Sequence, residues 1–591
     1  MLDVADTNLA TQVDDWLADF ERALADGDAS ELASLLCPDS YWRDVLAFTW
    51  TLSTVHGAQD IAAALAARSG KVQPADFKAS ASRTPPRIVT RAGTEALEAF
   101  FDFSTVHGRG EGVLRLVPAS DDDGQRMQAW TLMTALQALS GFEEHLDKAR
   151  PKGEAYSRDF HGPNWLDLRQ RAIAYCDHDP DVVVVGCGQA GLAIAARLTQ
   201  LGVDALIVDR HARIGDNWRK RYHALTLHNQ VQVNHMPYMP FPPNWPTYIP
   251  KDKLANWFEA YVEAMELNVW TGTEFLGGDH DAESGCWTVR LRLADGSERA
   301  MHPRHVVMAT GVSGIPSIPQ IPTLDAFNGT LLHSSRYDDA EPWAGKRAIV
   351  IGTGNSGHDI AQDLYAAGAK VTMVQRSPTM VVNIEPSAQI PYALYDEGPP
   401  LDDCDMITAS MPFALARRSH IEITRQAKEI DRNLLEGLAR RGFKLDFGPD
   451  GSGWQFLYLT RGGGYYFNVG CSDLIADGEV DLIQYEDIER FVAGGAVLED
   501  GTSVPADLIV LATGYKSPEA MVQRLFGDAI AQRVGGLWGF DEGDELRNTF
   551  VRTGQPGLWF IAGSLAQCRI FSKYLALQIK ACEEGLIAAA R

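Results

Sequence analysis

The sequence predicts an α/β fold with two dinucleotide-binding domains of the Rossmann type, one inserted in the other, after a small α+β domain. Two observations carry this prediction. A glycine-rich loop between a strand and a helix occurs twice, once from residue 186 and again from residue 352. The first 150 residues carry neither loop and differ in pattern from the rest of the chain. At 591 residues, the chain is long enough for about three or four domains.

The N-terminal segment starts with helical patterns and continues with strand patterns. "TQVDDWLADFERALADGDASELASLL" and "HGAQDIAAALAAR" repeat apolar residues at helical spacing. "EALEAFFDFSTV", "EGVLRLVPA" and "RMQAWTLMTAL" are typical of strands separated by polar breaks. Helices followed by a strand meander predict an α+β domain. The stretch after it, "KARPKGEAYSRDFHGPNW", is rich in charge, Gly and Pro, which predicts a linker.

The first glycine loop lies in "DVVVVGCGQAGLAIAARLTQLGVDALIVDR". Four valines predict a buried parallel strand, and an Ala/Leu-rich helix follows. Gly186 allows a tight turn, Gly188 lets a diphosphate approach the backbone, and Gly191 lets the helix pack on the strand. The next strand ends in Asp209, where a carboxylate can bind a ribose diol. A loop with its strand, helix and acid in place predicts a dinucleotide site.

The second glycine loop lies in "RAIVIGTGNSGHDIAQDLYAAGAKVTMVQRSP", with Gly352, Gly354 and Gly357 between a strand and a helix. The next strand ends in Arg376 and Ser377 instead of an acid. A guanidinium at this position accommodates the 2′-phosphate that distinguishes NADPH from NADH. The second site is therefore predicted to bind NADPH.

Two ATG turns follow buried strands, at Thr310 and Gly311 in "HVVMATG" and at Gly514 in "DLIVLATGY". They are expected where the chain returns to a nucleotide between the two domains. The final "GLWFIAGS" strand and the amphipathic "FSKYLALQIKACEEGL" helix complete the first domain. The predicted division is an α+β domain over 1–147, a linker over 148–179, the first dinucleotide domain over 180–335 and 511–591, and the second, with a substrate-region insertion, over 336–510.

Composition excludes several classes of function. A formal net charge of −25 disfavours nucleic acid and anionic membranes as partners. No apolar run reaches the roughly 18 residues of a membrane span, and the acidic N-terminus lacks a signal-peptide core, so we expect a cytoplasmic protein. The eight cysteines contain no CxxC pair and no zinc-ligand spacing. We therefore expect no metal site and no redox disulfide of the kind that a disulfide reductase needs beside its flavin.

Two further motifs carry a resemblance to a known family. "FNGTLLHSSRY", residues 327 to 337, matches the FxGxxxHxxx(Y/F) fingerprint of flavin-containing monooxygenases at every defined position. "RIGDNWRKRYHALTLHNQVQVNHMPYMPFP", after the first acid, resembles the flavin-covering segment of the YUCCA-like branch. The resemblance covers about residues 170 to 590 and implies FAD in the first site. It adds four residues to the expected cofactor contacts: Trp218, His333, Asn355 and Ser356.

This resemblance implies an NADPH- and O2-dependent monooxygenase that transfers one oxygen atom through a C4a-(hydro)peroxyflavin to a small organic substrate. The YUCCA-like spacing favours decarboxylative oxygenation of an arylpyruvate-like 2-oxo acid. Oxygenation of a sulfide, amine or ketone stays open, as does an NADPH-dependent reductase that passes electrons to a quinone or a protein.

The resemblance also assigns roles to three residues. His228 and Asn229 are expected near the reacting part of the flavin, because many family members have an Asn in this segment and YUCCA-like chains have a His. Packing or capping is an equal alternative for each. His333 lies between the first ATG turn and the second glycine loop. It is expected to hold this passage and NADP(H) and not to transfer a proton.

The N-terminal pattern "YWRDVLAFTW … HGAQDIAAAL" resembles the nuclear-transport-factor-like (SnoaL-like) cone, a curved sheet wrapped by helices. Such cones can house a catalytic pocket, which Asp44, His56 or Asp102 would line. No matched acid and base can be located in the sequence, so a docking or dimerisation module is the favoured role. By analogy with paired cones, a homodimer is expected.

Overall fold

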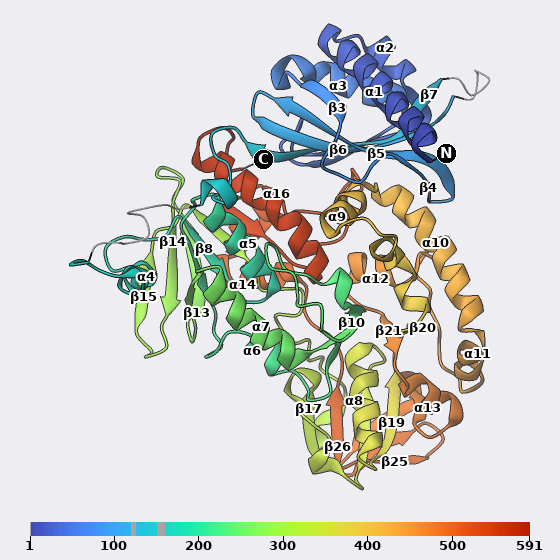
Figure 1. The fold of residues 1–591 in the computed structure, drawn as a ribbon. Coiled ribbons are helices and arrows are strands. Elements are labelled where there is room, and N and C mark those ends of the chain that lie inside the picture. Colours follow the sequence, from blue (N-terminus) through green and yellow to red (C-terminus); the bar gives the residue numbers. More distant parts are fainter. Residues whose placement is uncertain (1, 120–125, 151–159, 591) are drawn as a thin grey trace.

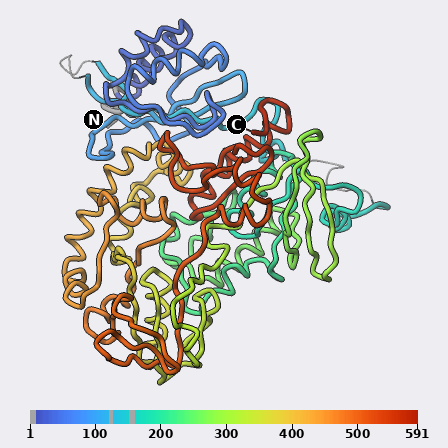
Figure 2. The backbone as a smooth tube through the Cα atoms, turned by 180° about the vertical axis from the view of Figure 1, so that it is seen from behind, coloured from blue at the N-terminus to red at the C-terminus, as the bar shows by residue number. Residues whose placement is uncertain are grey.

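The N-terminal domain lies across one end of two α/β units (Figure 1). The computed structural model describes residues 2–119, 126–150 and 160–590. The sheet that carries the second glycine loop is at the opposite end of the molecule, and the C-terminal helix passes beneath the N-terminal domain (Figures 1 and 2). Part of the predicted linker, residues 151–159, lies outside the described residues.

The N-terminal domain is a seven-stranded sheet with three helices on one face (Figure 1). The strand order is β2-β1-β7-β6-β5-β3, with β4 beside β5, and only the β1–β7 pair is parallel. The helices are α1 (Leu2–Asp26), α2 (Ala29–Ser34) and α3 (Ala58–Val72), and the strands are β1 (Leu36–Val45), β2 (Leu52–His56), β3 (Ala75–Ala79), β4 (Arg87–Arg91), β5 (Thr94–Thr105), β6 (Gly108–Pro118) and β7 (Met127–Leu139). The predicted α+β order is present, and the resemblance to a SnoaL-like cone stays a prediction.

Aromatic side chains fill the space between the helices and this sheet. Phe77 stacks on Phe103 with ring centroids 5.1 Å apart, and Phe20 meets Phe77 edge-on at 5.4 Å. Phe101 and Trp42 are also buried there. These rings occupy the interior in which an enzyme of cone type would hold its substrate.

Two of the residues suggested for a cone pocket, Asp44 and His56, have other partners. The Asp44 carboxylate is buried and accepts hydrogen bonds from the backbone N–H groups of Phe48 and Thr49 and from the Thr134 hydroxyl. His56 stacks on Tyr41 and pairs with an exposed carboxylate on the other face of the sheet. Because strand residues alternate between faces, Asp44 and the His56–Tyr41 pair point in opposite directions. The docking role of this domain stays a prediction.

The first glycine loop belongs to a five-stranded parallel sheet of order β12-β9-β8-β16-β27. Its strands are β8 (Val182–Val185), β9 (Ala205–Val208), β12 (Asn268–Trp270), β16 (His305–Met308) and β27 (Leu558–Phe560). Val182 and Val184 pack toward α5 (Gln189–Gln200) and α16 (Leu565–Glu583), whereas Val183 and Val185 pack toward β13 (Glu274–His280) and β14 (Trp287–Arg292). Both faces of β8 are covered, which explains its run of four valines.

The second glycine loop repeats this arrangement in a parallel sheet of order β17-β26-β18-β19-β22. Its strands are β17 (Thr330–His333), β18 (Arg347–Ile351), β19 (Lys370–Gln375), β22 (Asp481–Gln484) and β26 (Leu508–Leu511). Helix α8 (Asn355–Ala366) covers one face, and the small sheet β23-β24-β25 (Ile488–Val492, Gly495–Leu498, Ser503–Pro505) accompanies the other. Strand β17 lies before residue 336, the predicted start of the second domain, but it pairs with β26 of the second sheet. This strand of the fingerprint segment therefore belongs to the second unit.

A mainly helical segment is inserted between β19 and β22. It contains β20 (Met380–Asn383), the 3-10 helix η7 (Ser387–Asp396), α9 (Leu401–Ser410), α10 (Phe413–Ile430), α11 (Arg432–Arg440), α12 (Gly453–Arg461), β21 (Tyr465–Asn468) and α13 (Cys471–Asp477). Strands β20 and β21 pair in parallel and hold the two ends of the insertion together. Helices α9 and α10 reach the N-terminal domain (Figure 1).

Helix α16 is present where the sequence predicts an amphipathic helix, and it is more buried than that pattern indicates. Nearly all of its residues are buried, including Arg569 and Gln578. The first sheet covers one side of the helix through α5, and strand β7 of the N-terminal domain contacts another. Arg569 is buried by its ion pair with Asp405, and Gln578 donates to the carbonyl oxygen of Phe550. Tyr574 contacts Gln137 of β7.

Among the described residues, none of the helices combines the length and the apolar character that crossing a bilayer requires.

Candidate cofactor and active site

The glycines of the first loop are required by close backbone contacts. Gly186 has a φ of +111°, and a Cβ added to it would lie 2.7 Å from the carbonyl oxygen of Ala309. A Cβ added to Gly191 would lie 1.9 Å from the carbonyl oxygen of Gly186. Side chains at these positions would push α5 away from β8. Gly188 precedes α5 without a side-chain cap, so the first amides of the helix are available to an anion.

Asp209 follows β9 and is held beside this loop. Its Oδ2 accepts a hydrogen bond from the backbone N–H of Cys187 at 2.7 Å, and its Oδ1 accepts one from the backbone N–H of His211 at 2.8 Å. Burial opposes ionisation, but hydrogen bonds from His211 and Cys187 outweigh it and lower the pKa of Asp209. The carboxylate is therefore ionised and suited to accept hydrogen bonds from ribose hydroxyls.

A cavity of about 730 Å³ runs along the carboxyl ends of the first sheet. Six of the predicted cofactor residues line it: Gly186, Gly188, Asp209, Trp218, Thr310 and Gly311. It continues past Tyr458 and Tyr515 to Ser564, which caps the N-terminus of α16. A glycine cradle, a ribose acceptor and a second helix N-terminus within one cavity fit a dinucleotide in chemistry and in size.

The second loop has the same steric design. Gly352 has a φ of +118°, and a Cβ on Gly357 would lie 2.1 Å from the carbonyl oxygen of Gly352. Around Gly354 the nearest atom to an added Cβ is the carbonyl oxygen of Tyr465, at 4.0 Å. Gly354 thus leaves an open approach to the N-terminus of α8, where a diphosphate can bind. Asn355 and Ser356 begin that helix.

Arg376 and Ser377 follow β19 at the edge of the second loop. The preceding Gln375 is fully buried, and its amide bonds to both backbone groups of Lys444, at 2.9 and 2.8 Å. Arg376 is exposed and its Nε lies 3.4 Å from the Ser377 hydroxyl. Gln375 therefore anchors the turn while the guanidinium remains accessible to a phosphate.

Arg376→Ala is expected to raise the KM for NADPH by about 10- to 100-fold, because a charge-assisted contact to phosphate contributes about 1.5–3 kcal/mol. The KM for NADH, which has no 2′-phosphate, should stay near its wild-type value. Steady-state kinetics with both coenzymes measure this. Arg425→Ala, which removes an exposed guanidinium paired with Glu422, is the matched control. An equal rise for both coenzymes would contradict the assignment.

The fingerprint "FNGTLLHSSRY" ties the second sheet to its helix. Phe327 is buried in the core below the sheet. A Cβ on Gly329 would lie 2.3 Å from the Phe327 ring and 2.7 Å from the carbonyl oxygen of Asp507. The Tyr337 hydroxyl donates a hydrogen bond to Asp363 Oδ2 on α8, at 2.7 Å. The fingerprint positions thus have packing and anchoring roles.

His333 connects the end of β17 with the second ATG turn. Its Nε2 lies 3.1 Å from the carbonyl oxygen of Gly514, and its Nδ1 lies 3.1 Å from the backbone nitrogen of Ser335. These partners place a proton on Nε2, which donates, and leave Nδ1 to accept. Burial lowers the pKa of His333. A neutral ring with both nitrogens engaged suits a structural bridge and not a proton donor.

His333→Ala is expected to increase peroxide release per NADPH oxidised by about fivefold, the equivalent of one lost hydrogen bond of about 1 kcal/mol. The reason is that the ATG turn beside the cofactor cavity loses its anchor. A peroxide assay alongside NADPH consumption measures the ratio. His302→Ala, which removes an exposed histidine, is the control. An unchanged ratio in His333→Ala would contradict the bridging role.

His228 and Asn229 lie in β10 (Thr226–Gln230), and neither lines the first cavity. The His228 ring meets Phe467 edge-on at 5.4 Å, and its carbonyl oxygen accepts a hydrogen bond from Gln389. Burial lowers the pKa of His228, against an attraction from Asp359. The Asn229 side chain hydrogen-bonds with Tyr392 of η7. Both residues therefore face the insertion, and their catalytic role stays a prediction.

A buried acid beside His228 could not be identified from the sequence. The Tyr222 hydroxyl donates a hydrogen bond to Asp359 Oδ2 at 2.5 Å, and burial raises the pKa of Asp359. Asp359 follows the second glycine loop on α8, and Tyr222 follows α6 (Asp216–Arg219) in the first unit. The pair joins the two units, and neither residue belongs to a motif that would indicate the other.

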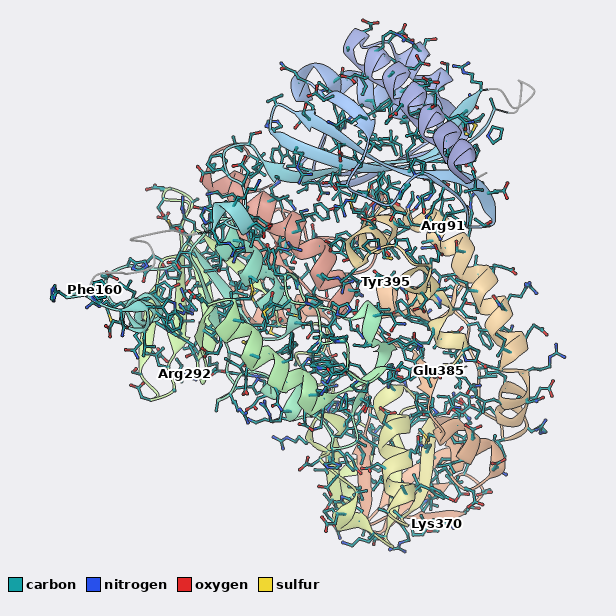
Figure 3. All side chains as sticks on the ribbon, in the orientation of Figure 1. Arg91, Phe160, Arg292, Lys370, Glu385 and Tyr395 are labelled. Carbon is teal, nitrogen blue, oxygen red and sulfur yellow. The ribbon has the colours of Figure 1, made fainter. Side chains whose placement is uncertain are left out.

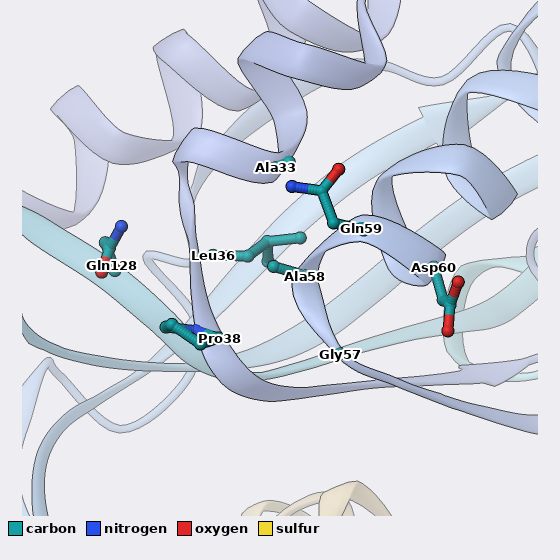
Figure 4. A pocket seen from close by; sticks show the side chains of 8 residues that line it. All are labelled: Ala33, Leu36, Pro38, Gly57, Ala58, Gln59, Asp60 and Gln128. Carbon is teal, nitrogen blue, oxygen red and sulfur yellow. The ribbon is translucent and has the colours of Figure 1, made fainter.

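A second cavity, of about 440 Å³, lies in the N-terminal domain (Figure 4). Its lining includes Pro38, Gly57, Gln59, Asp60 and Gln128. Asp60 is its one ionisable residue, so the cavity contains no acid and base pair.

The part of the chain that the structure describes contains no assembled site for metal binding or for thiol chemistry. No three His, Cys, Asp or Glu side chains there are arranged to hold a metal ion. All eight cysteines are free, and burial raises the pKa of Cys187, the one next to the first loop, above its ordinary value.

Comparisons with known proteins show which family the chain resembles. The family model described as "Pyridine nucleotide-disulphide oxidoreductase" matches residues 183–393. The chain is 32% identical over 346 residues to indole-3-pyruvate monooxygenase YUCCA1 of Oryza sativa subsp. japonica, covering 57% of this chain and 77% of the relative. It is 30% identical over 338 residues to the probable indole-3-pyruvate monooxygenase YUCCA9 of Arabidopsis thaliana, covering 57% and 75%.

Among solved structures, the closed crystal structure of cyclohexanone monooxygenase matches with a TM-score of 0.51 and 17% identity, covering 69% of this chain and 85% of that one. This likeness confirms the predicted fold with two dinucleotide-binding units. The relatives confirm the resemblance given by the fingerprint, and with it the dependence on FAD and NADPH. The chain belongs to the YUCCA-like flavin monooxygenases and is an NADPH- and O2-dependent oxidoreductase.

Proposed function

We propose that this enzyme oxygenates a small aromatic 2-oxo acid, an arylpyruvate, and releases carbon dioxide. The observation that carries this proposal is an aromatic wall that begins at the cofactor cavity. Tyr458 lines the cavity and also packs on a cluster in the insertion. The rings of that cluster are Tyr392, Trp454, Tyr465 and Phe467.

This wall suits an aromatic substrate in geometry and in polarity. Trp454 meets Phe467 edge-on with centroids 4.9 Å apart, and Phe467 meets His228 edge-on as well. Rigid rings offer a planar apolar ligand a large contact area at a low cost in conformational entropy. Asn229 supplies an amide at the border of the wall, where the polar end of the substrate would lie. The relatives named as indole-3-pyruvate monooxygenases support the same substrate class.

We assign FAD to the first loop and NADPH to the second. Asp209 would hold the FAD ribose, Gly188 and the α5 N-terminus its diphosphate, and Trp218, Thr310 and Gly311 the rest of the cavity wall. Arg376 and Ser377 would hold the 2′-phosphate of NADPH. When bound, the two cofactors supply hydride transfer to the flavin and the activation of O2.

The protein's own contribution is placement and the exclusion of water. The N-terminus of α16, capped by Ser564, directs a positive dipole end into the cavity, where it can stabilise negative charge. Tyr458 and the aromatic cluster close the other side. His228 is neutral because burial lowers its pKa, so its ring can donate or accept a hydrogen bond without carrying charge.

The overall reaction balances as follows: the 2-oxo acid, O2, NADPH and a proton give the acid shortened by one carbon, carbon dioxide, NADP+ and water. The bond between the carboxyl and carbonyl carbons breaks, and one oxygen atom joins the former carbonyl carbon. The second oxygen atom leaves as water with the electrons of NADPH.

A substrate panel tests the proposal. Indole-3-pyruvate and phenylpyruvate should each yield about one shortened acid per NADPH, whereas pyruvate, an aryl sulfide and a tertiary amine should yield peroxide without product. Turnover of the sulfide or amine, with none of the arylpyruvates, would overturn the substrate class. Oxidation of NADPH with a quinone and with no oxygenated product would favour the reductase alternative.

The predicted homodimer and cytoplasmic location stay predictions. The open face of the N-terminal sheet, the surface that paired cones would share, is covered by α9 and α10 of the same chain (Figure 1). A homodimer would therefore use another surface, and analytical ultracentrifugation of the purified enzyme tests for it.

A further inference from the structure

The N-terminal domain contacts the flavoprotein part through several charged side chains, among them Arg43, Arg83 and Arg115. Its open sheet face, the face without helices, meets α9, α10 and α16 (Figures 1 and 3). A small apolar contact is formed by Tyr41 and Trp130 of the sheet with Leu415 of α10. A larger apolar cluster also includes residues of the N-terminal domain together with Met406 of α9 and Phe571 of α16. Hydrogen bonds and ion pairs add to these contacts, and several of them involve α9.

Helix α9 is held at both of its ends by arginines of the N-terminal domain. At its start, Asp403 accepts hydrogen bonds from Arg83 Nη1 at 2.9 Å and from the backbone N–H and hydroxyl of Thr84 at 2.8 and 2.5 Å. At its end, the Ser410 hydroxyl accepts a hydrogen bond from Arg115 Nη2 at 2.9 Å. The side chains of Arg115 and Asp403 are 0% and 4% exposed, so these contacts are inaccessible to water.

Arg43 of β1 adds a third buried contact at the same end of α9. Its Nη1 donates to the carbonyl oxygen of Ala409 at 2.5 Å. Its other nitrogens form a two-pronged ion pair with Glu545, at 2.8 and 2.7 Å, and Thr54 also donates to Glu545 at 2.7 Å. Both charged side chains are nearly fully buried. If one partner of such a pair moves away, the other remains as an uncompensated buried charge. Separation of the domain by small steps is therefore unfavourable.

The other side of α9 is bound to the active-site region. Arg569 of α16 forms a two-pronged ion pair with Asp405, with both distances 2.7 Å. Its Nη1 also donates to the carbonyl oxygens of Val233 and His235, at 2.9 and 2.8 Å. These carbonyls follow directly on β10, the strand that carries His228 and Asn229.

The 3-10 helix η7, which precedes α9, also contacts both the N-terminal domain and the β10 segment. Glu397, at its end, accepts hydrogen bonds from Arg91 of β4 at 2.7 and 2.9 Å (Figure 3 labels Arg91). Tyr395 donates to Asp405 at 2.9 Å. Gln389 donates to the carbonyl oxygen of His228 at 3.0 Å. Both η7 and α9 therefore lie between the N-terminal sheet and the β10 segment, and polar contacts bind them on both sides.

We propose that the N-terminal domain is an intramolecular clamp that positions η7 and α9, and through them the β10 segment, so that the oxygenating site stays closed to water. Asp403 is then a positioning residue for the reaction although it touches neither cofactor nor substrate. Arginines of the sheet contact an acid, a hydroxyl and a carbonyl oxygen of one helix, and that helix contacts the β10 segment through Arg569.

The test compares two Asp→Asn variants of the full-length enzyme. Asp403→Asn removes a charge from the α9 contact. Asp39→Asn removes a charge from an exposed contact between the same domain and Arg418 of α10, which does not involve α9. Both variants are measured as purified, first by hydrogen exchange in residues 387–411, and then by the rate of peroxide formation with NADPH and no substrate. Neither measurement depends on the identity of the substrate, so failure of the clamp is distinct from failure of the proposed arylpyruvate activity.

Asp403→Asn is expected to exchange faster in η7 and α9 and to form peroxide roughly three- to tenfold faster than Asp39→Asn, at equal flavin content and melting temperature. Thr84→Val removes the hydrogen bond that the Thr84 hydroxyl donates to the same carboxylate. If Asp403→Asn fails to fold, Thr84→Val must show the same pattern at smaller amplitude. Equal exchange in residues 387–411 for the α9 variant and Asp39→Asn, or faster exchange with an unchanged peroxide rate, would overturn the proposal.

Discussion

Gly191→Ala is expected to purify with almost no flavin. The Cβ of the new residue would lie 1.9 Å from the carbonyl oxygen of Gly186, a backbone atom that cannot turn aside. Helix α5 must therefore move away from β8, and its N-terminus leaves the position where the diphosphate binds. A displacement of about 1 Å at such a site costs roughly 100-fold in binding or rate. The flavin absorbance per protein, and the stoichiometry after incubation with added FAD, measure the effect.

The control for this variant is Gly70→Ala. Gly70 lies in α3, no atom lies within 4 Å of an added Cβ, and its φ is outside the left-handed region. This variant should keep the flavin and gain about 0.5–1 kcal/mol in the free energy of unfolding. A full complement of FAD in Gly191→Ala would show that the first loop does not bind the diphosphate.

Gly354→Ala is expected to lose NADPH binding while keeping the fold and the FAD. In the protein itself the added methyl group has open space, with the carbonyl oxygen of Tyr465 as its nearest neighbour at 4.0 Å. Its φ of −82° is ordinary for any residue. The methyl group would occupy the approach to the N-terminus of α8, so the KM for NADPH should rise by about 100-fold. Steady-state kinetics, flavin content and melting temperature together measure this selectivity.

Gly357→Ala is the contrasting variant in the same loop. Its Cβ would lie 2.1 Å from the carbonyl oxygen of Gly352, so the protein itself must distort and the melting temperature should fall. If Gly354→Ala instead kept a wild-type KM for NADPH, the diphosphate would have to bind elsewhere.

The glycine loops could be predicted from the sequence because their requirements are local. Gly191 and Gly357 exclude every larger residue through contacts with Gly186 and Gly352 of the same strand-turn-helix unit. Asp209 and Arg376 follow the next strand in each unit, at a position that the parallel topology determines. The fingerprint is also local in its main effect, since Phe327 packs on Gly329.

The contacts between distant segments could not be predicted in this way. Arg43 and Glu545 are separated by 502 residues, and no sequence pattern links the two. Asp405 resembles any acid on an exposed helix until Arg569 is placed against it. The burial of α16 has the same cause, because Arg569 pairs with Asp405 and Tyr574 bonds with Gln137, which lies 437 positions earlier in the chain.

The role of the N-terminal domain stays a prediction, and the two faces of its sheet bear on it differently. Its sequence is compatible with a catalytic cone, yet phenylalanines fill the interior. The Asp44 carboxylate accepts hydrogen bonds from the turn that follows its own strand. The charged residues of interest are on the opposite face of the sheet. Because strand residues alternate between faces, the interior residues and the charged residues lie on opposite sides of the sheet. The partners of the charged residues on α9 are visible only in the structure.

The most direct test of the central claim is turnover of indole-3-pyruvate with NADPH under oxygen-18 gas, followed by mass spectrometry of the products. The proposed reaction predicts one labelled oxygen atom in the shortened acid, with carbon dioxide and NADP+ formed in about equal amounts. NADPH oxidation that yields no labelled acid, with every electron recovered in peroxide or in an added quinone, would contradict it.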